Sequence, residues 1–348
     1  MLPSLLATFL VGCAAPAQDS LASAPAATTA ASPADRSIQA ALDAAYTAYR
    51  DLEEGANADY IPALAAVDPG LYGLALVTAE GKVFTAGDVE TQVSIQSISK
   101  PFTMAKVIEE SGPDAIFGVI GVDATGMKFN SIISIEPAKG VQGGPEMNAM
   151  VNPGAIAATS MVKGETRGAI WRSILDWYSA FAGRPLSVDE EVFASEAATN
   201  QRNRAIAALM YAYDYIEGDH EQAADVYTEQ CSVAVNARDL AFMGATLANG
   251  GTNPVTEERV LSPENVPYVL AVMATAGLYD DSGKWLWRTG LPAKSGVGGG
   301  IVAVCPGRFG IAVVSPPLDE AGNSVRAQRA IADVVRALDA NPYAVKPR

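Results

Sequence analysis

The chain has 348 residues, of which 49% are hydrophobic and 18% are charged, so it can bury a large core as one domain or two subdomains. Its formal net charge of −15 argues against nucleic acids and anionic membrane surfaces as partners, because both are bound through basic patches. One histidine and three cysteines give no disulfide framework and no metal-ligand spacing, so we expect no metal and no cofactor, with Cys231 and Cys305 buried.

The N-terminal segment differs in composition from the rest of the chain. Residues 5–11 form an apolar run too short to span a membrane, and Leu10-Val11-Gly12-Cys13 resembles the lipobox of bacterial lipoproteins. Residues 14–34 are rich in Ala, Ser, Thr and Pro, which is typical of a disordered tether. We therefore predict a lipoprotein signal over residues 1–13, lipidation of Cys13, a membrane tether, and export to the cell envelope or periplasm.

A cytoplasmic location is the alternative. Secretory signals normally begin with a positive charge, whereas the first basic residue here is Arg36. The apolar start would then be accidental.

The first predicted elements are a helix, a hairpin and a short strand. Asp35 to about Glu54 has apolar side chains at helical spacing. Leu71 to Gly87 has the pattern of a β-hairpin with its turn at Glu80-Gly81-Lys82, and the alternating run Thr91 to Ile95 is typical of a strand.

Ser97-Ile98-Ser99-Lys100 follows this strand and is the first candidate for chemistry. In a helix, Ser97 and Lys100 share one face, with Cβ atoms roughly 5–6 Å apart. A serine hydroxyl becomes a nucleophile when a base takes its proton, and a lysine can be that base once its pKa is lowered. Because Pro101 fits only the first turn of a helix, we expect the helix to begin near Ser97, where unpaired N–H groups favour developing negative charge.

A second Ser-x-x-Lys, Ser160-Met161-Val162-Lys163, shows how weak this motif is alone. About one such match is expected by chance in a chain of this size. Ser160 lies inside an Ala-rich helical run and not at the start of a helix. The setting therefore favours Ser97 as the nucleophile.

The rest of the chain divides into a helical block and a second set of strands. Residues 97–284 are mostly helical in pattern. Strands are then expected around Lys294, over Gly300–Cys305 and over Gly310–Val314, and a final helix over about Gly322–Leu338.

This order of elements predicts an α+β fold for residues 35–348. The segments 35–96 and 285–348 would share one antiparallel sheet, with the terminal helices on one face and the helical subdomain beside it. The cleft between the sheet and the helical subdomain is where Ser97 and Lys294 are expected to meet.

Lys294-Ser295-Gly296 forms a second motif on the far side of this cleft. Together with the Ser97 motif it is typical of serine β-lactamases and penicillin-binding proteins, in which a lysine activates the serine. We expect the positive charge of Lys294 to lower the pKa of Lys100. His220 stands in an acidic stretch and is interpreted as a solvated loop residue, so Ser-His-Asp and Cys-His mechanisms are not supported.

Several segments, in one fixed order, carry a resemblance to a known family. They are Asp59-Tyr60-Ile61-Pro62, Gln96-Ser97-Ile98-Ser99-Lys100, Met150-Val151-Asn152-Pro153-Gly154, Arg202-Asn203-Arg204-Ala205, Leu247-Ala248-Asn249-Gly250-Gly251, Gly277-Leu278-Tyr279-Asp280, Gly290 to Gly300, and Ser315-Pro316-Pro317-Leu318-Asp319. From about Tyr60 to Asn323 the chain is similar to the bacterial and mitochondrial serine-dependent glutaminases, which have a β-lactamase-like fold. It departs from them at Pro153, where the family usually has Ala.

The resemblance implies hydrolysis of L-glutamine to L-glutamate and ammonia without a metal. It implies that Ser97 forms a γ-glutamyl ester, that Lys100 is its base and that Tyr279 relays protons to the leaving ammonia. The backbone N–H groups of Ser97 and Val297 would form the oxyanion hole. The implied substrate-binding side chains are those of Tyr60, Asn152, Glu196, Asn203 and Tyr227, supported by the strand Lys294-Ser295-Gly296.

Two alternatives remain open at this point. A β-lactamase or D-Ala-D-Ala peptidase would suit the lipobox, but no Ser-Asp-Asn triplet lies between the two motifs. A non-catalytic lipoprotein that binds an amino acid would have no chemical reason to keep Ser97, Lys100, Tyr279 and Lys294. We also expect a homo-oligomer, either a dimer or a tetramer.

Overall fold

The computed structural model describes Met1 and residues 32–136 and 147–345. The predicted lipoprotein signal with Cys13, and the predicted tether up to residue 31, lie outside the described residues. The first helix, α1 (Pro33–Tyr49), is capped by Ser32, whose hydroxyl accepts a hydrogen bond from the backbone N–H of Asp35 at 3.1 Å. It starts two residues earlier than expected and ends five residues earlier. No helix among the described residues is both long and apolar enough to cross a membrane.

The two ends of the chain meet in one five-stranded antiparallel sheet, as predicted. Its strand order is β2-β1-β8-β7-β6. In chain order the strands are β1 (Gly73–Thr78), β2 (Val83–Gly87), β6 (Ala293–Gly296), β7 (Gly300–Cys305) and β8 (Phe309–Val314). The N-terminal hairpin therefore pairs with the last strand of the chain, which brings the strand that bears Lys294 into the same sheet.

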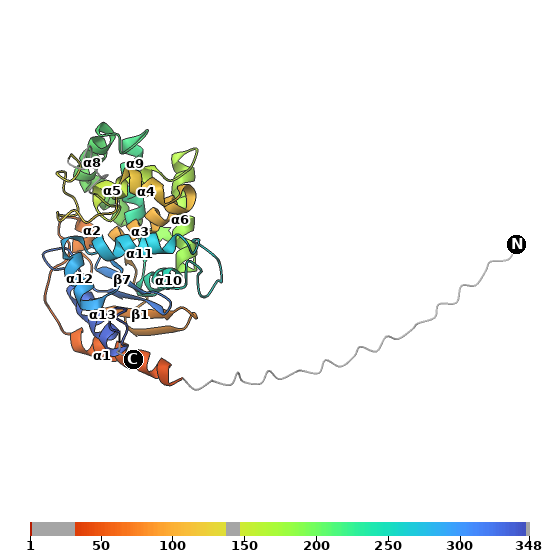
Figure 1. Ribbon diagram of the computed structural model, residues 1–348, viewed down its shortest axis with the longest axis vertical. Helices are drawn as coiled ribbons and strands as arrows, with labels where there is room; N and C mark the ends of the chain where they lie inside the picture. The colour runs from red at the N-terminus through yellow and green to blue at the C-terminus, as the bar shows by residue number, and fades with distance from the viewer. Residues whose placement is uncertain (2–31, 137–146, 346–348) are drawn as a thin grey trace.

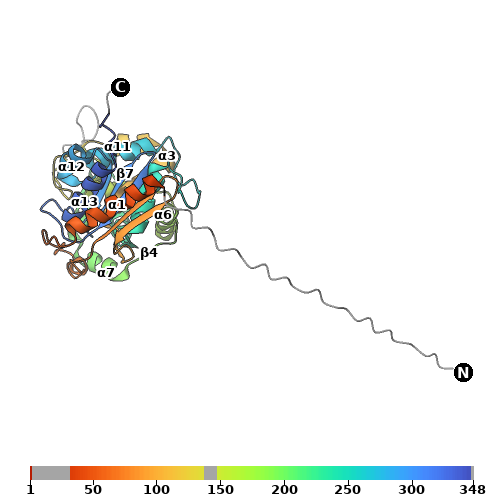
Figure 2. The same cartoon turned by 90° about the horizontal axis from the view of Figure 1, so that it is seen from below.

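One face of this sheet is covered by the terminal helices. The register of β1 and β8 places Leu76 opposite Ile311 and Ala75 opposite Ala312, and successive side chains point to opposite faces. Leu76 and Ile311 belong to the core that the sheet shares with α1 and α13 (Val325–Ala337). Figure 2 shows these two helices lying next to each other across the sheet.

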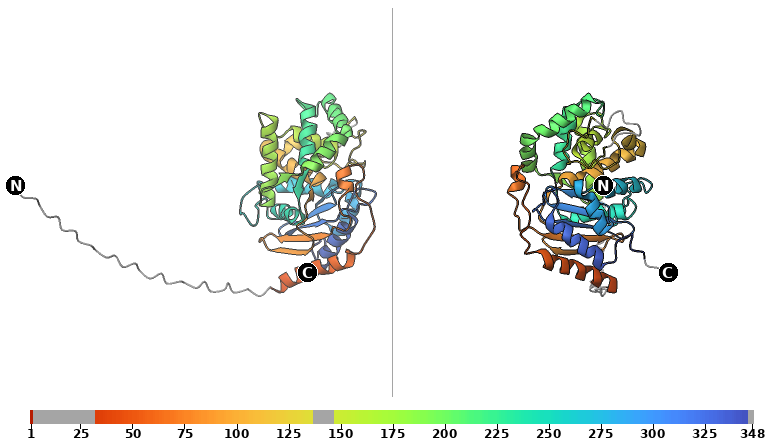
Figure 3. Two further views of the ribbon diagram at one scale, coloured as in Figure 1. Left: turned by 180° about the vertical axis from the view of Figure 1, so that it is seen from behind. Right: turned by 60° about the vertical axis from the view of Figure 1, so that its left-hand side comes forward.

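The other face of the sheet packs on α10 (Ala237–Ala248), which links it to the helical subdomain. The approach is so close that a Cβ atom at Gly310 would lie 2.2 Å from the backbone nitrogen of Ala245. The absence of a side chain at Gly310 is therefore a condition for this contact. In Figure 3 the sheet lies between the terminal helices and the helices of the middle of the chain.

The middle of the chain is mainly helical, as the sequence predicts (Figure 1). Its helices are α2 (Pro62–Ala65), α3 (Ser99–Ser111), α4 (Pro113–Val119), α5 (Asn152–Ser160), α6 (Arg167–Ala182), α7 (Glu190–Thr199), α8 (Gln201–Ala212), α9 (His220–Cys231), α11 (Val266–Ala276) and α12 (Ser282–Thr289). A small second sheet, in the order β3-β5-β4, consists of Val93–Ser94, Val233–Val235 and Ser187–Val188. Only the first of its strands was anticipated.

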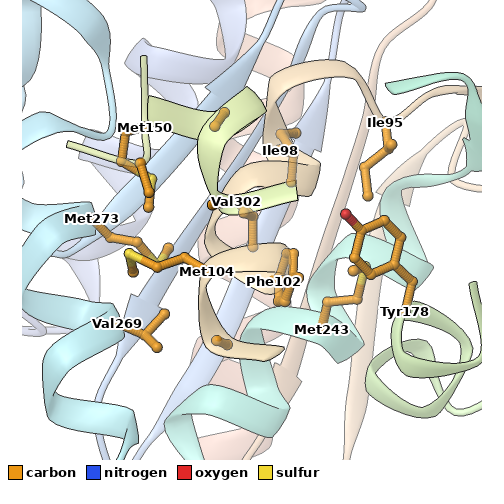
Figure 4. Close-up of a cluster of buried hydrophobic side chains, with 14 of the residues drawn as sticks. Ile95, Ile98, Phe102, Met104, Met150, Tyr178, Met243, Val269, Met273 and Val302 are labelled. Carbon is orange, nitrogen blue, oxygen red and sulfur yellow. The ribbon is translucent and has the colours of Figure 1, made fainter. Parts of the chain in front are cut away.

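Helix α3 runs through the interior of the molecule. All of its residues from Ser99 to Ile108 are buried. Figure 4 shows Phe102 and Met104 of this helix among side chains from several other elements. Because the helix also carries polar side chains into the core, each of them needs a hydrogen-bond partner there.

Candidate active site

Ser97 lies at the junction that leads from the small sheet into α3. It belongs to a 3₁₀ turn (Gln96–Ile98), and α3 begins two residues later at Ser99. Pro101 is in the first turn of α3, where its missing N–H is tolerated. The preceding residue, Gln96, has a left-handed backbone with φ of 51°, which is uncommon for a residue with a side chain. The helix was expected to begin near Ser97. In the structure Ser97 lies in the 3₁₀ turn just before the helix, and α3 begins at Ser99.

Lys100 is buried three residues beyond Ser97, with 1% of its surface exposed. Its Nζ donates a hydrogen bond of 2.7 Å to Oδ1 of Asn152, an amide oxygen and not a carboxylate. Burial lowers the pKa of Lys100 to about 8, because the charged ammonium loses its hydration. A substantial fraction of this lysine is therefore neutral, and able to accept a proton, near pH 8.

Lys294 is fully buried on β6, and its Nζ donates to the carbonyl oxygens of Gly277 at 2.9 Å and Ser295 at 2.7 Å. Burial is the main reason why the pKa of Lys294 lies well below its ordinary value, and the charge of Lys100 adds to the effect. Burial is the main cause of the lowered pKa of Lys100 as well. The two buried ammonium groups repel each other, so their protonation is coupled, and the expected influence of Lys294 on Lys100 is secondary to burial.

Tyr279 connects the serine to the Lys294 strand. Its hydroxyl donates to the carbonyl oxygen of Ser295 at 3.3 Å and lies close enough to the side chain of Ser97 to interact with it. Its ring centroid lies 4.1 Å from Nζ of Lys294. Burial raises the pKa of Tyr279 to about 12, so the phenol keeps its proton at neutral pH. Tyr279 also has a left-handed backbone, with φ of 55°.

Three of the predicted substrate-binding side chains form one hydrogen-bonded group. Oδ1 of Asn152 accepts from Lys100 and also from the hydroxyl of Tyr227 at 3.2 Å, while its Nδ2 donates to Oδ1 of Asn203 at 2.9 Å. Asn152 is the first residue of α5, so Pro153 falls within the first turn. Proline is well accommodated there, and this departure from the usual family sequence leaves Asn152 beside Lys100.

Glu196 lies on α7 and is 8% exposed. It accepts a hydrogen bond from Nε2 of Gln96, which also donates to Oγ of Ser94 at 3.0 Å. Burial raises the pKa of Glu196 to about 7, and the bond from Gln96 partly offsets the effect. Sequence reasoning did not single out Gln96, although its position immediately before Ser97 was a signal.

A glycine-rich loop brings Val297 next to Ser97. A Cβ atom at Gly296 would lie 2.9 Å from the carbonyl oxygen of Ile95, and one at Gly298 would lie 2.6 Å from that of Ser94. The loop can therefore approach the strand before Ser97 only because these positions have no side chain.

An open cleft of about 900 Å³ lies in front of these groups. Tyr60 and Val297 line it, and Tyr60 is 54% exposed. Phe129 also lines the cleft and packs on Tyr279, with ring centroids 4.9 Å apart. Within the described residues, no group of three or more His, Cys, Asp or Glu side chains could hold a metal ion. The serine, the two lysines and the tyrosine are at most 7% exposed and do not line the cleft themselves. They lie next to it, since Asp280 and Val297, which follow Tyr279 and the Lys294 strand in the chain, are among its lining residues.

The residues set aside in the sequence lie away from this site. Oγ of Ser160 donates to the carbonyl oxygen of Ala157 at 2.7 Å, and Nζ of Lys163 donates to that of Glu110. His220 is the first residue of α9 and not a loop residue, and its ring centroid lies 5.2 Å from that of Tyr211. Both Cys231 and Cys305 are buried, as expected.

Comparison with known proteins identifies the family. Residues 55–343 match the family model described as Glutaminase. The chain belongs to the glutaminase family. A glutaminase of Colwellia psychrerythraea is 52% identical over 314 residues, which cover 90% of this chain and 100% of the relative. This protein is accordingly a glutaminase, which decides against a penicillin-recognising enzyme and a non-catalytic binding protein.

Solved structures agree with this assignment and confirm the predicted fold class. One described as the probable glutaminase ybaS superposes with a TM-score of 0.86 at 48% identity, over 89% of this chain and 99% of that one. A probable glutaminase from Bacillus subtilis, solved in complex with 6-diazo-5-oxo-L-norleucine, gives a TM-score of 0.79 at 28% identity, over 88% of this chain and 97% of that one.

Proposed function

We propose that this glutaminase hydrolyses L-glutamine to L-glutamate and ammonia through a covalent γ-glutamyl ester on Ser97. The observation that supports this most strongly is the environment of Lys100. Lys100 follows Ser97 by three residues, and its ammonium is buried against the amide oxygen of Asn152. Its pKa is lowered to about 8. A lysine in that state can remove the serine proton, whereas an exposed lysine would stay charged.

In the acylation step, Oγ of Ser97 attacks the carbon of the side-chain amide while its proton passes to Nζ of Lys100. The carbonyl oxygen becomes an oxyanion, held by the N–H groups of Ser97 and Val297. Each such donor typically lowers the barrier by about 3 kcal/mol. The tight approach of the Gly296–Gly298 loop to the strand before Ser97 supports this pairing.

Tyr279 completes the proton path. Its phenol is protonated at neutral pH and lies close to the side chain of Ser97. It donates its proton to the amide nitrogen as the C–N bond breaks, so that ammonia leaves, and it regains a proton from Lys100. Water then attacks the ester by the reverse proton transfers and releases L-glutamate.

The two charged groups of the α-carbon require opposite partners. Glu196 is suited to the α-ammonium group, because a carboxylate pairs with it and a buried site strengthens the interaction. The amide and hydroxyl donors of Asn152, Asn203 and Tyr227 are suited to the α-carboxylate. Tyr60 would close the mouth of the cleft over the bound amino acid.

We further propose that the protein is an exported lipoprotein, anchored through a lipidated Cys13, and that it forms a dimer or tetramer. Incorporation of radiolabelled palmitate into the wild-type chain but not into Cys13→Ser tests the anchor. Light scattering of the purified protein in solution tests the oligomer.

The experiment for the catalytic proposal is ammonia release from L-glutamine by the purified protein, compared with Ser97→Ala and with hydrolysis of the β-lactam nitrocefin. We expect turnover of glutamine that is lost in Ser97→Ala, without loss of the fold by circular dichroism. A Ser97→Ala protein that still releases ammonia would exclude the ester. The mass of a Ser97 adduct, trapped with 6-diazo-5-oxo-L-norleucine, provides a second and direct test.

A further inference from the structure

A second layer of polar side chains lies on the three helices that carry the lysine site. Lys100, Asn152 and Tyr227 come from α3, α5 and α9. One or two turns further along the same helices stand three buried polar residues: Thr103, Thr159 and Gln230. Residues three or seven positions apart share a helix face, so this layer lies on the same side of each helix as the site.

These side chains form one continuous set of hydrogen bonds with Tyr178 of α6. The hydroxyl of Tyr178 contacts Oγ1 of Thr103, which donates to Oε1 of Gln230 at 3.1 Å. Nε2 of Gln230 donates to Oγ1 of Thr159 at 3.2 Å, and Thr159 donates to the carbonyl oxygen of Ala155 at 2.9 Å. We call Tyr178, Thr103, Gln230 and Thr159 the hydroxyl–amide chain. All four are at most 2% exposed.

Every member of the hydroxyl–amide chain has a partner for its side-chain polar atoms. Thr103 donates to Gln230, Gln230 donates to Thr159, and Thr159 donates to a backbone carbonyl oxygen. The hydroxyl of Tyr178 contacts Oγ1 of Thr103, where either hydroxyl can be the donor, and donates to a second backbone carbonyl oxygen. Breaking one bond would leave a buried polar group unpaired, which is costly away from water. The four helices are therefore held in one relative position.

The hydroxyl–amide chain also touches the segment that carries the lysine. The hydroxyl of Tyr178 lies 3.2 Å from the carbonyl oxygen of Ser99, the residue directly before Lys100. Its ring packs edge-on against Phe102, with centroids 6.4 Å apart. Figure 4 shows Tyr178 with its hydroxyl oxygen directed toward the helix of Phe102 and Met104.

We propose that the hydroxyl–amide chain positions the catalytic lysine, by fixing α3 against α5 and α9 so that Lys100, Asn152 and Tyr227 meet. The inference rests on the proposed role of Lys100 as the base. None of the four side chains is expected to touch the substrate, so each acts through the lysine contacts. A displacement of about 1 Å between catalytic groups is enough to cost on the order of 100-fold in rate.

The test is Thr103→Val, which replaces a hydroxyl by a methyl group of similar size. We expect kcat/KM to fall about 10- to 100-fold. We also expect the acid limb of its pH profile to move to higher pH, because a loosened Lys100 gains water. Thr103→Ser, which keeps the hydroxyl, should restore both the rate and the profile. Tyr178→Phe removes a single oxygen atom and should behave like Thr103→Val. It replaces Thr103→Val as the test variant if the Thr103→Val protein folds poorly.

Thr246→Val is the matched control. Thr246 is also fully buried, but its hydroxyl lies on α10 and bonds to the carbonyl oxygens of Phe181 and Phe242. The Thr246→Val substitution should lower the thermal midpoint about as much as Thr103→Val does, while leaving kcat/KM and the pH profile unchanged.

Two outcomes overturn the inference and separate it from the proposed function. Folded Thr103→Val and Tyr178→Phe proteins with wild-type rates and pH profiles would show a purely structural role, even if both melt earlier. If Lys100→Ala retains activity, the lysine is not the base, and the proposed function and the inference fail together. An inactive Lys100→Ala beside unaffected Thr103→Val would overturn the inference alone.

Discussion

The chemistry of Lys100 should be visible in the pH dependence of the enzyme. Only the neutral amine can take the proton of Ser97, and burial places the pKa of Lys100 at about 8. The value of kcat/KM should therefore rise with pH through about 8. Lys100→Ala should lower kcat by roughly 10³-fold, within the range of general-base catalysis, and should abolish this limb.

Lys106 provides the matched control for Lys100. It is a second buried lysine on α3, but its ammonium pairs with Glu110 at 2.9 Å. Lys106→Met should leave the pH profile unchanged. Loss of the limb at pH 8 in Lys106→Met, or its survival in Lys100→Ala, would refute the assignment of the base.

Glu196 should control recognition of the α-ammonium group. Burial raises the pKa of Glu196 to about 7, so the carboxylate of the free enzyme is partly protonated below that pH and KM should rise there. Glu196→Gln should raise KM roughly 30-fold or more, equivalent to about 2 kcal/mol, with a smaller change in kcat. Initial rates over a range of glutamine concentrations measure both quantities.

The substrate itself offers a check on Glu196. The same molecule without its α-amino group, 4-carbamoylbutanoate, should react equally well with wild-type and Glu196→Gln enzyme. Glu191→Gln, an exposed substitution on the same helix, is the control. An equal loss on both substrates would mean that Glu196 supports the fold and does not recognise the amine.

At the scale of single residues, the sequence predicts which groups meet but not their backbone conformations. Ser97 and Lys100 could be named from a motif because it combines reactive side chains with fixed spacing, whereas Tyr279 was named through the resemblance to the glutaminases. The left-handed backbone conformations of Gln96 and Tyr279 could not be predicted, since neither glutamine nor tyrosine favours that conformation. The surrounding packing imposes them. The contact of Gln96 with Glu196 follows from this backbone and was missed for the same reason.

At the scale of elements, the packing of α10 on the sheet depends on Gly310. Gly310→Ala would place a methyl group 2.2 Å from the backbone nitrogen of Ala245, where no side-chain rotation can relieve the clash. We expect a loss of about 1–3 kcal/mol in the free energy of unfolding, measured by urea denaturation. Gly168→Ala, on α6 with no atom within 4 Å of the new methyl group, should be neutral or slightly stabilising. Equal effects would contradict this packing argument.

Long periodic elements were predictable, whereas two of the three short strands of the small sheet were not. The hairpin of β1 and β2 was placed from alternation and a Gly turn, and the final helix from its apolar period. Strands β4 and β5 are two and three residues long, too short to produce a period. They exist because β3 and β4 pair with the two edges of β5, a tertiary contact that a local pattern does not reveal.

At the scale of the whole molecule, joining both chain ends in one sheet was predictable from the order of elements. Two strand sets separated by a helical block can bury their apolar faces only by meeting. The hydroxyl–amide chain was not predictable, because Thr103, Tyr178 and Gln230 are far apart in sequence and each has an ordinary local pattern. Only the packing of the helices brings their polar atoms together.

Burial of Lys100 should also cost the molecule stability. The pKa of Lys100 is about 8 in the folded protein and 10.5 when unperturbed. Between these values the unfolded state binds more protons, so its free energy falls relative to the folded state as the pH decreases. The destabilisation is absent above pH 10.5, grows as the pH falls toward 8, and is complete below 8. The difference in pKa corresponds to about 3 kcal/mol.

Lys100→Met isolates this cost, because methionine fills similar space without a charge. At pH 7 the inactive Lys100→Met protein should be more stable than the wild type by up to about 3 kcal/mol, and the difference should shrink as the pH rises from 8 to 10.5. Urea denaturation of both proteins across this range measures it. Titrating groups that do not interact with Lys100 cancel in the comparison, whereas Lys294 is relieved of the repulsion from Lys100 in the variant. A stability difference that does not change with pH would mean that Lys100 is not held in a desolvated state, and the basis for its role as the base would be lost.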